Sequence, residues 1–359
     1  MSTSKSHSLE ELIRVGLDYG TLFLEIATQH LGPGMRIDDA SIEDVCLPSR
    51  NLVRRVEIVR AGVDLGEEVP EVGLPWGEPA VMQWLRDNPR GEHKVLSCWK
   101  MALHPSFRQR EVVKRTLDIL LGDMPKTHFN IIRIVQSWIR EHLIDIKAEV
   151  MEWYRIRSLS DRGRQRNWDS LIWEIQIAVP ASWGPDAANV MTVAAREPGF
   201  DRANTREEPQ CVAGACMKIL SNGAYLQEND SILFLDVGAG TSDAAIIKLR
   251  SSPSSRDRLK LECVGPSIGI QGGFLVINNE AWKYIETCQE IRDHGGVNRL
   301  LRYLGSTLEE CQRQVSKRIE YMKMKSMPRL GPPEVIIIRP SHMRGASYEV
   351  THLEILVDQ

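Results

Sequence analysis

The stretch Ser231-Ile-Leu-Phe-Leu-Asp-Val-Gly-Ala-Gly-Thr-Ser-Asp243 decides the fold. Its apolar first half predicts a β-strand, and its glycine turn leads into a second apolar run at Ala244-Ala-Ile-Ile-Lys-Leu249. A shorter version occurs near the N-terminus, where Ile13-Arg-Val-Gly-Leu-Asp-Tyr19 is followed by Gly20-Thr21 and another apolar run. Two acidic hairpins of one kind predict two related lobes that face a cleft.

Helical patterns alternate with these strands. Apolar residues recur every three or four positions over residues 127–157, which predicts a long helix, and residues 186–196 predict a shorter one. Further strands are predicted at residues 173–179, 334–338 and 354–357. The sequence therefore predicts an α/β chain with lobe I over residues 1–228 and lobe II over residues 229–359.

The composition excludes several classes of protein. The chain has 359 residues and a net charge of −3, which gives no electrostatic footprint for binding nucleic acid or a membrane surface. It contains no apolar run long enough for a transmembrane helix. Its 7 cysteines include no closely spaced pair typical of zinc sites, so reduced thiols and a cytoplasmic location are expected.

The two hairpins have the chemistry of a phosphate site. Glycines let backbone N–H groups approach a phosphate, and a threonine hydroxyl adds a donor. A carboxylate at the end of a strand can hold magnesium through water. The candidate phosphate-binding residues are Gly20, Thr21, Gly238, Gly240 and Thr241, and the candidate magnesium-binding residues are Asp18 and Asp236. Either hairpin alone is also compatible with an ordinary tight turn.

A third candidate is Glu208, which precedes Pro209 at the start of a predicted helix. Such a carboxylate either interacts with the helix dipole or orients metal-bound water. The sequence contains no GxxxxGK[ST], GxGxxG, GxSxG or HExxH motif, which argues against the corresponding nucleotide, hydrolase and zinc sites.

The order of these motifs resembles the ATPase domain of the heat-shock protein 70 family, within the actin-like ATPase superfamily. The resemblance rests on Val15–Thr21, Ile177–Trp183, Glu208-Pro209, Asp236–Asp243 and the glycine pair Gly272-Gly273. It implies a two-lobed actin-like, ribonuclease H-like fold. The chain ends before the family's last glycine-rich loop, so we expect a divergent member in which the second lobe and closing segment are incomplete.

The resemblance also implies a role for each matched residue. Asp236 would orient the attacking water and Glu208 the metal-bound water, while Lys100 would stabilise the transferring phosphoryl group. A solvated helix lysine is the alternative for Lys100. The remaining nucleotide-binding residues would be Asp18, Gly20, Thr21, Gly238, Gly240, Thr241, Asp243, Gly272, Gly273, Lys317 and Arg318, with magnesium at Asp18 and Asp236.

The function implied is that of an ATP-binding protein similar to the heat-shock protein 70 family. It would be a slow magnesium-dependent ATP hydrolase with a chaperone-type role, and its partners would be ATP or ADP and protein clients or co-chaperones. Leu22 and Ala239 depart from the family pattern, which keeps open a non-catalytic interaction protein on a degenerate ATPase scaffold. A small-molecule kinase on the same superfamily fold is the third alternative.

Overall fold

A computed structural model gives the fold of the chain. It describes residues 11–20, 24–32, 35, 40, 42–44, 57–60, 93–96, 99–158, 168, 171–220, 227–250, 260–293, 295–304, 308, 311–312, 314–315, 334–338 and 353–357. The chain divides into two compact units, Met1–Gly272 and Gly273–Gln359. The boundary predicted between residues 228 and 229 falls inside the first unit, and the division into lobes stays a prediction.

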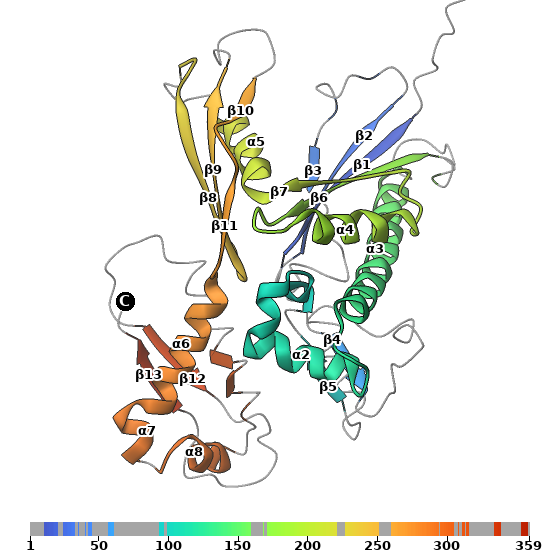
Figure 1. Ribbon diagram of the computed structural model, residues 1–359. Helices are drawn as coiled ribbons and strands as arrows, with labels where there is room; N and C mark the ends of the chain where they lie inside the picture. The colour runs from blue at the N-terminus through green and yellow to red at the C-terminus, as the bar shows by residue number, and fades with distance from the viewer. Residues whose placement is uncertain are drawn as a thin grey trace, which may run out of the picture. The chain divides into compact units, whose positions relative to one another are not determined.

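A five-stranded sheet organises the first unit (Figure 1). Its central strand β1 (Leu12–Tyr19) pairs antiparallel with β2 (Leu24–Leu31) and parallel with β6 (Ile172–Val179). The outer strands are β3 (Ile42–Asp44), antiparallel to β2, and β7 (Arg202–Glu207), parallel to β6. The order β3-β2-β1-β6-β7, with antiparallel strands followed by parallel ones, is the ribonuclease H-like arrangement that the resemblance implies.

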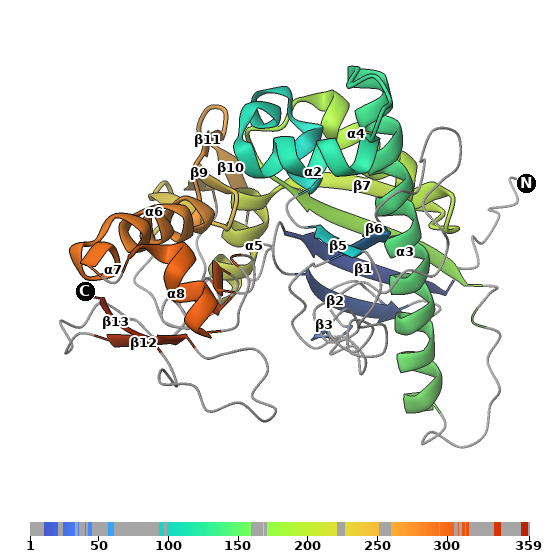
Figure 2. The ribbon, with the colours of Figure 1, turned by 90° about the horizontal axis from the view of Figure 1, so that it is seen from below.

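Helices α3 (His128–Ser158) and α4 (Pro185–Arg196) confirm the two predicted helices. They pack against each other, and α4 also packs against β6 and β7, on one side of the sheet (Figure 2). The apolar stripe of α3 is buried, as its spacing predicts. None of the described helices is long and apolar enough to cross a membrane.

Shorter elements lie between β3 and α3. They are the hairpin β4 (Glu57–Arg60) and β5 (His93–Leu96), the 3₁₀ helices η2 (Trp99–Leu103) and η3 (Pro105–Gln109), and helix α2 (Glu111–Leu121). All five side chains of η2 are buried, and η2 packs against α2 and α3. The short helix η2 therefore lies in the interior of the first unit.

The second sheet of the first unit is antiparallel throughout. Strand β9 (Thr241–Leu249) pairs on one side with β8 (Ser231–Val237) and on the other with β10 (Leu261–Cys263) and β11 (Ile268–Gln271). This order of first, second and third strand repeats the order β1-β2-β3 of the main sheet. Each of the two acidic hairpins therefore joins the first and second strands of its sheet.

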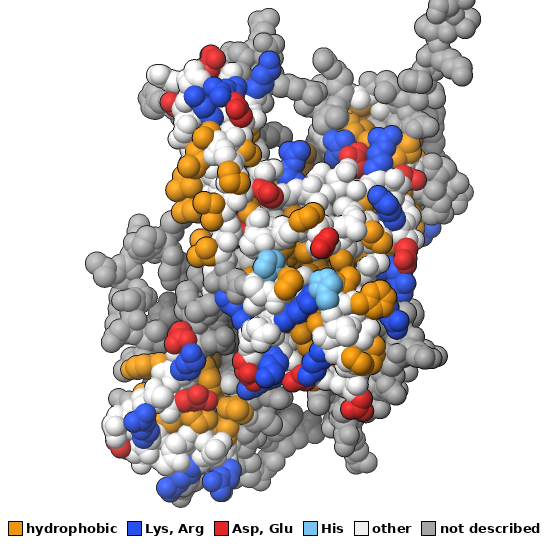
Figure 3. Space-filling model, viewed as in Figure 1, with side chains coloured by type: hydrophobic (Ala, Val, Ile, Leu, Met, Phe, Trp, Pro, Cys, Tyr) orange, Lys and Arg blue, Asp and Glu red, His pale blue; other side chains and the backbone are white. Residues whose placement is uncertain are grey.

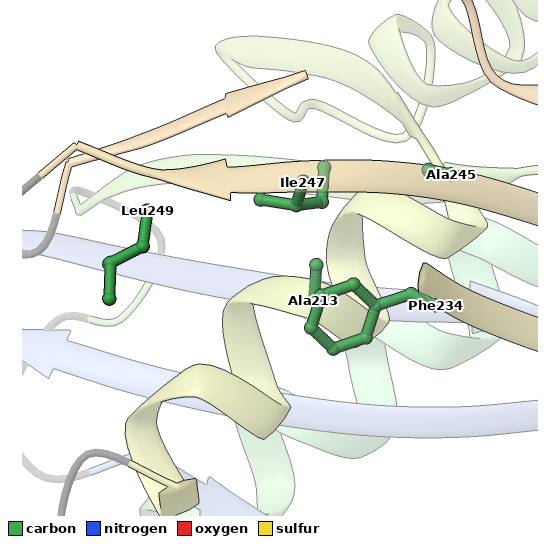
Figure 4. Packing of buried hydrophobic residues seen from close by; sticks show 5 residues of the cluster. All are labelled: Ala213, Phe234, Ala245, Ile247 and Leu249. Atoms are coloured by element: carbon green, nitrogen blue, oxygen red, sulfur yellow. The ribbon is translucent and has the colours of Figure 1, made fainter. Parts of the chain in front are cut away.

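The two faces of the second sheet differ. Helix α5 (Glu208–Leu220) covers one face, and the buried cluster there is formed by Ala213, Phe234, Ala245, Ile247 and Leu249 (Figure 4). The residues that alternate with these point to the other face. Exposed apolar side chains gather there, part of which is visible in Figure 3: Leu233, Leu235, Val237, Ile246, Ile268 and Ile270.

The second unit contains helices and one hairpin. Its helices are α6 (Phe274–Thr287), α7 (Gln289–Asp293) and α8 (Val297–Leu304). Strands β12 (Glu334–Ile338) and β13 (Leu353–Val357) pair antiparallel, and they confirm the two strands predicted near the C-terminus.

Lys147 in α3 forms hydrogen bonds to the segment that follows α4. Its Nζ donates to the carbonyl oxygens of Pro198 at 3.1 Å and Gly199 at 2.6 Å, and it lies 5.2 Å from the ring centre of Trp173. We expect Lys147→Met to lower the free energy of unfolding by about 1–3 kcal/mol, because two charged hydrogen bonds are lost. Urea denaturation measures this change.

Lys126→Met is the matched control. Lys126 pairs with Asp118 on the surface, where both side chains are about half exposed, so its replacement should change stability by less than about 1 kcal/mol. Equal losses from the two substitutions would contradict the role given to Lys147.

Candidate active site

Three acidic residues stand where chain elements begin or end. Asp18 is the penultimate residue of β1, and Asp236 is the penultimate residue of β8. Glu208 is the first residue of α5, directly after β7. The two sheets and the helix between them therefore each supply one of the acidic residues that the sequence singles out.

The charges of these carboxylates influence one another's pKa. Burial raises the pKa of Glu208 to about 8; Lys100 lowers it, while Asp18, Asp236 and Asp243 raise it further. Burial also raises the pKa of Asp236, and the charges of Asp18 and Asp243 add to the effect. Asp18 and Asp236 are therefore close enough for their charges to interact, while the binding of one phosphate chain by both hairpins stays a prediction.

Lys100 is the ammonium group of this site. It lies in η2 and only 3% of its surface is exposed, so the alternative of a solvated lysine is wrong. Its Nζ donates to the carbonyl oxygen of Tyr19 and lies 3.9 Å from Glu208 Oε1. The ring of Trp183 lies 4.8 Å from the same nitrogen, a cation–π contact.

Backbone hydrogen bonds close the second glycine turn. The N–H of Gly238 donates to the carbonyl of Thr241 at 3.0 Å, and the N–H of Gly272 donates to that of Gly240 at 3.3 Å. Gly272 has a φ of +151°, which favours glycine. Asn229 is the one non-glycine residue with positive φ in the described part, so Ala239 fits its turn without backbone strain.

Asp243 joins the two sheets. Its side chain is buried on β9, and its Oδ1 accepts backbone N–H groups of Ala181 at 2.8 Å and Ser182 at 3.4 Å, in the turn after β6. Burial raises the pKa of this carboxyl. The structure thus gives Asp243 a definite partner in the first sheet, whereas its role as a nucleotide ligand stays a prediction.

Several predicted site residues fall elsewhere. Thr21, Lys317 and Arg318 lie outside the described residues, as does Leu22. Gly20 follows β1 directly, and Gly273 is the N-cap of α6 in the second unit. The described residues include no group of three His, Cys, Asp or Glu side chains arranged to hold a metal ion directly. Magnesium binding at Asp18 and Asp236 therefore stays a prediction.

Sequence reasoning missed two features of this site. The first is Gly269, discussed below; the second is Tyr19, whose carbonyl holds Lys100 and whose hydroxyl lies 2.6 Å from His142 Nδ1. Tyr19 follows the acidic residue of the first hairpin, and an aromatic side chain at this point is the one signal that could have indicated a buried anchor. The position of His142 in a regular helical stripe gave no such signal.

Comparisons with known proteins add little to this geometry. No protein-family model matches the chain, and no curated protein matches it. A solved structure similar to it is that of MreB5 of Spiroplasma citri bound to ADP, at 12% sequence identity and a TM-score of 0.47. The alignment covers 96% of this chain and 71% of that one. The fold assignment rests on the strand order and directions described above.

Gly269 leaves no room for a side chain. A Cβ atom there would lie 2.2 Å from Asp243 Oδ1 and 2.6 Å from Ser182 N. We expect Gly269→Ala to push the turn after β6 away from β9 and to lower the free energy of unfolding by about 1–3 kcal/mol. Thermal and urea denaturation measure the loss.

The control is Gly214→Ala in the exposed part of α5, where a Cβ atom would have nothing within 4 Å. Because alanine favours a helix more than glycine does, this variant should gain up to about 1 kcal/mol. A neutral effect of Gly269→Ala would contradict the close approach between the two sheets.

The pH dependence of stability tests the environment of Glu208. Its folded-state pKa of about 8 lies above the usual 4.5, so the folded state holds the proton more tightly. The stabilisation that comes from this tighter proton binding is complete below a pH of about 4.5 and is lost as the pH rises to about 8. We expect the free energy of unfolding of the wild type to fall by a few kcal/mol across this window.

Glu208→Gln should make that decline shallower, because glutamine does not titrate. Glu197→Gln, at an exposed carboxylate paired with Arg140, should leave it unchanged. Urea denaturation at a series of pH values gives all three slopes. Parallel slopes for the wild type and Glu208→Gln would contradict the raised pKa of Glu208.

Proposed function

We propose that the chain binds magnesium-complexed ATP or ADP at this site and hydrolyses ATP slowly. The observation that carries the proposal is the convergence of Asp18, Glu208 and Asp236 around the buried Lys100. Acidic groups brought so close that they raise one another's pKa need added positive charge. A magnesium ion would supply it.

The donor set fits that ion. Carboxylate oxygens are ligands that magnesium prefers, and it usually keeps several of its waters. Asp18 and Asp236 are the residues that would hold it, since both are accessible to solvent in part, whereas Asp243 is buried with its Oδ1 on backbone amides. When bound, magnesium supplies the charge that neutralises phosphate oxygens.

The chain's own residues would bind the phosphates, stabilise their charge and orient the attacking water. In the glycine turn after β8, Gly240 would offer its backbone N–H to the phosphates, since the N–H of Gly238 donates to the carbonyl of Thr241. Lys100 would place a positive charge near the transferring phosphoryl group, and Asp236 would orient the attacking water. Catalysis of this kind is mostly positioning and charge stabilisation, so it depends on how firmly these groups are held.

The finer proposal is a chaperone-type role. It is supported by the resemblance of the phosphate loops, the Glu208-Pro209 helix start and the Ile177–Trp183 segment to the heat-shock protein 70 family. Protein clients or co-chaperones would be the partners, and nucleotide hydrolysis would regulate their binding.

A non-catalytic interaction protein is the second candidate function. The exposed apolar face of the second sheet, which includes Leu235, Ile246 and Ile270, favours it because large apolar patches often mark interaction surfaces. Phosphate release separates the two candidates. Release that is lost in Asp236→Asn supports hydrolysis, and nucleotide binding without release supports the second candidate.

Calorimetric titration with Mg-ATP tests the proposal directly. The wild type should bind, and at 100 times the dissociation constant the nucleotide should raise the free energy of unfolding by about 2.7 kcal/mol. We expect Asp236→Asn to weaken binding by at least about tenfold, because one carboxylate that would hold magnesium is removed; such a loss corresponds to about 1.4 kcal/mol.

Asp230→Asn is the matched control. Asp230 directly precedes β8, at the other end of the strand that carries Asp236, and its Oδ2 accepts the N–H of Gln227. This variant should bind Mg-ATP as the wild type does. Absence of binding in the wild type, or equal losses in the two variants, would show that the proposed site is wrong.

A further inference from the structure

A buried polar pair lies beneath the proposed site. Tyr19 is the last residue of β1, and its hydroxyl lies 2.6 Å from Nδ1 of His142 in α3; both residues are buried. The other buried side chains on this face of β1 are Ile13, Val15 and Leu17, all aliphatic. Because burying polar groups costs free energy even when they are paired, an apolar residue at position 19 would be the simpler core choice.

Tyr19 connects helix α3 to the site through two separate groups. Its hydroxyl interacts with His142, and its backbone carbonyl accepts the hydrogen bond from Lys100 Nζ. The neighbouring Asp18 projects to the opposite face of the strand, since successive side chains alternate. One residue therefore fixes both the end of the strand that carries Asp18 and the ammonium group that faces Glu208.

Trp99, the first residue of η2, packs its ring against both Tyr19 and His142. Its ring lies 6.1 Å from that of Tyr19 and 5.6 Å from that of His142, both edge to face. The ring of Trp138, also in α3, lies 5.7 Å from Trp99. We call Tyr19, Trp99, Trp138 and His142 the anchor cluster. Since Lys100 directly follows Trp99, the anchor cluster holds Lys100 through its backbone as well as through its ammonium group.

We propose that the hydrogen bond between Tyr19 and His142 is a positioning element that holds the ammonium group of Lys100 beside Glu208. The inference rests on the proposed function for its purpose, because Lys100 is the cation that would face the phosphates. Tyr19 and His142 would themselves contact no ligand. They act on the site through the carbonyl of Tyr19.

The accessibility of the Lys100 amine tests the proposal without any nucleotide. The rate at which an amine-acylating reagent labels each lysine of the intact chain is followed by peptide mass spectrometry. In the wild type Lys100 should react slowly, because it is buried and hydrogen-bonded. We expect Tyr19→Phe and His142→Leu to speed its labelling by about three- to tenfold, on the order of one lost buried hydrogen bond.

Lys147 is the internal reference, because its amine is also held by backbone carbonyls, between α3 and the end of α4. Its labelling rate should not change. His142→Gln should return Lys100 toward the wild-type rate, since the amide can still share a hydrogen bond with the tyrosine hydroxyl. If His142→Leu does not fold, Tyr19→Phe decides, because it keeps the ring and removes one oxygen atom.

An unchanged rate at Lys100 would overturn the proposal, and so would equal acceleration at Lys100 and Lys147, which would mean general loosening. Tyr154 is a second buried tyrosine and lies in α3. Tyr154→Phe should leave the labelling of Lys100 unchanged. Acceleration of Lys100 in this control would likewise count against a specific role for Tyr19.

Mg-ATP binding distinguishes this inference from the proposed function. Tyr19→Phe should weaken Mg-ATP binding by about three- to tenfold in the wild-type background and have no further effect in a Lys100→Met background. An equal loss in both backgrounds would overturn the link through Lys100. A wild type that binds no nucleotide would contradict the proposed function alone, because the labelling rates decide the positioning role independently.

Discussion

Among the residues that the structure describes, the charges of Asp18, Glu208, Asp236 and Asp243 interact beside the buried ammonium group of Lys100, and this imbalance of charge is the constraint on which the site depends. Desolvation and mutual repulsion raise the pKa of Glu208 to about 8, although Lys100 opposes them. Such a cluster persists only because the surrounding fold is stable enough to hold it. Holding these acidic groups together lowers the stability of the folded state, and clusters of perturbed pKa values are typical of functional sites.

The fold brings these groups together by repeating one arrangement. In each sheet an acidic residue stands near the end of the first strand, at Asp18 in β1 and Asp236 in β8. Helix α5 begins at Glu208 after the first sheet and packs on the second, so its first residue lies between them. Because strands alternate their side chains, the residue that follows Asp18 can serve as a buried anchor.

The local elements were predictable from periodicity and turn chemistry. The apolar stripe of α3, the alternation in β6 and the glycine turn after Asp236 each determine an element from neighbouring residues, and all three are confirmed. An interaction between the charges of Asp18 and Asp236 could also be predicted, because the two hairpins are of the same kind. The helix start at Glu208-Pro209 indicated Glu208, and the resemblance supplied Lys100, but nothing local to either residue determined its burial.

The interactions that the sequence could not predict join residues far apart in the chain. The burial of Lys100 depends on Tyr19, Glu208 and Trp183, which come from three different elements. Asp243 and Ser182 occupy the space that a side chain at position 269 would need. The sequence pattern of β11 does not indicate this close contact. Such contacts depend on the placement of whole elements, which single-sequence patterns do not determine.

The contact between Asp243 and the amides of Ala181 and Ser182 links the distance between β9 and the turn after β6 to the protonation of the Asp243 carboxyl group. Any motion that separates β9 from the turn after β6 exposes a carboxyl group whose pKa burial has raised. Its pKa then falls toward the ordinary value for aspartate, so opening releases protons. Raising the pH through the interval between the two pKa values would accordingly favour separation of β9 from the turn after β6.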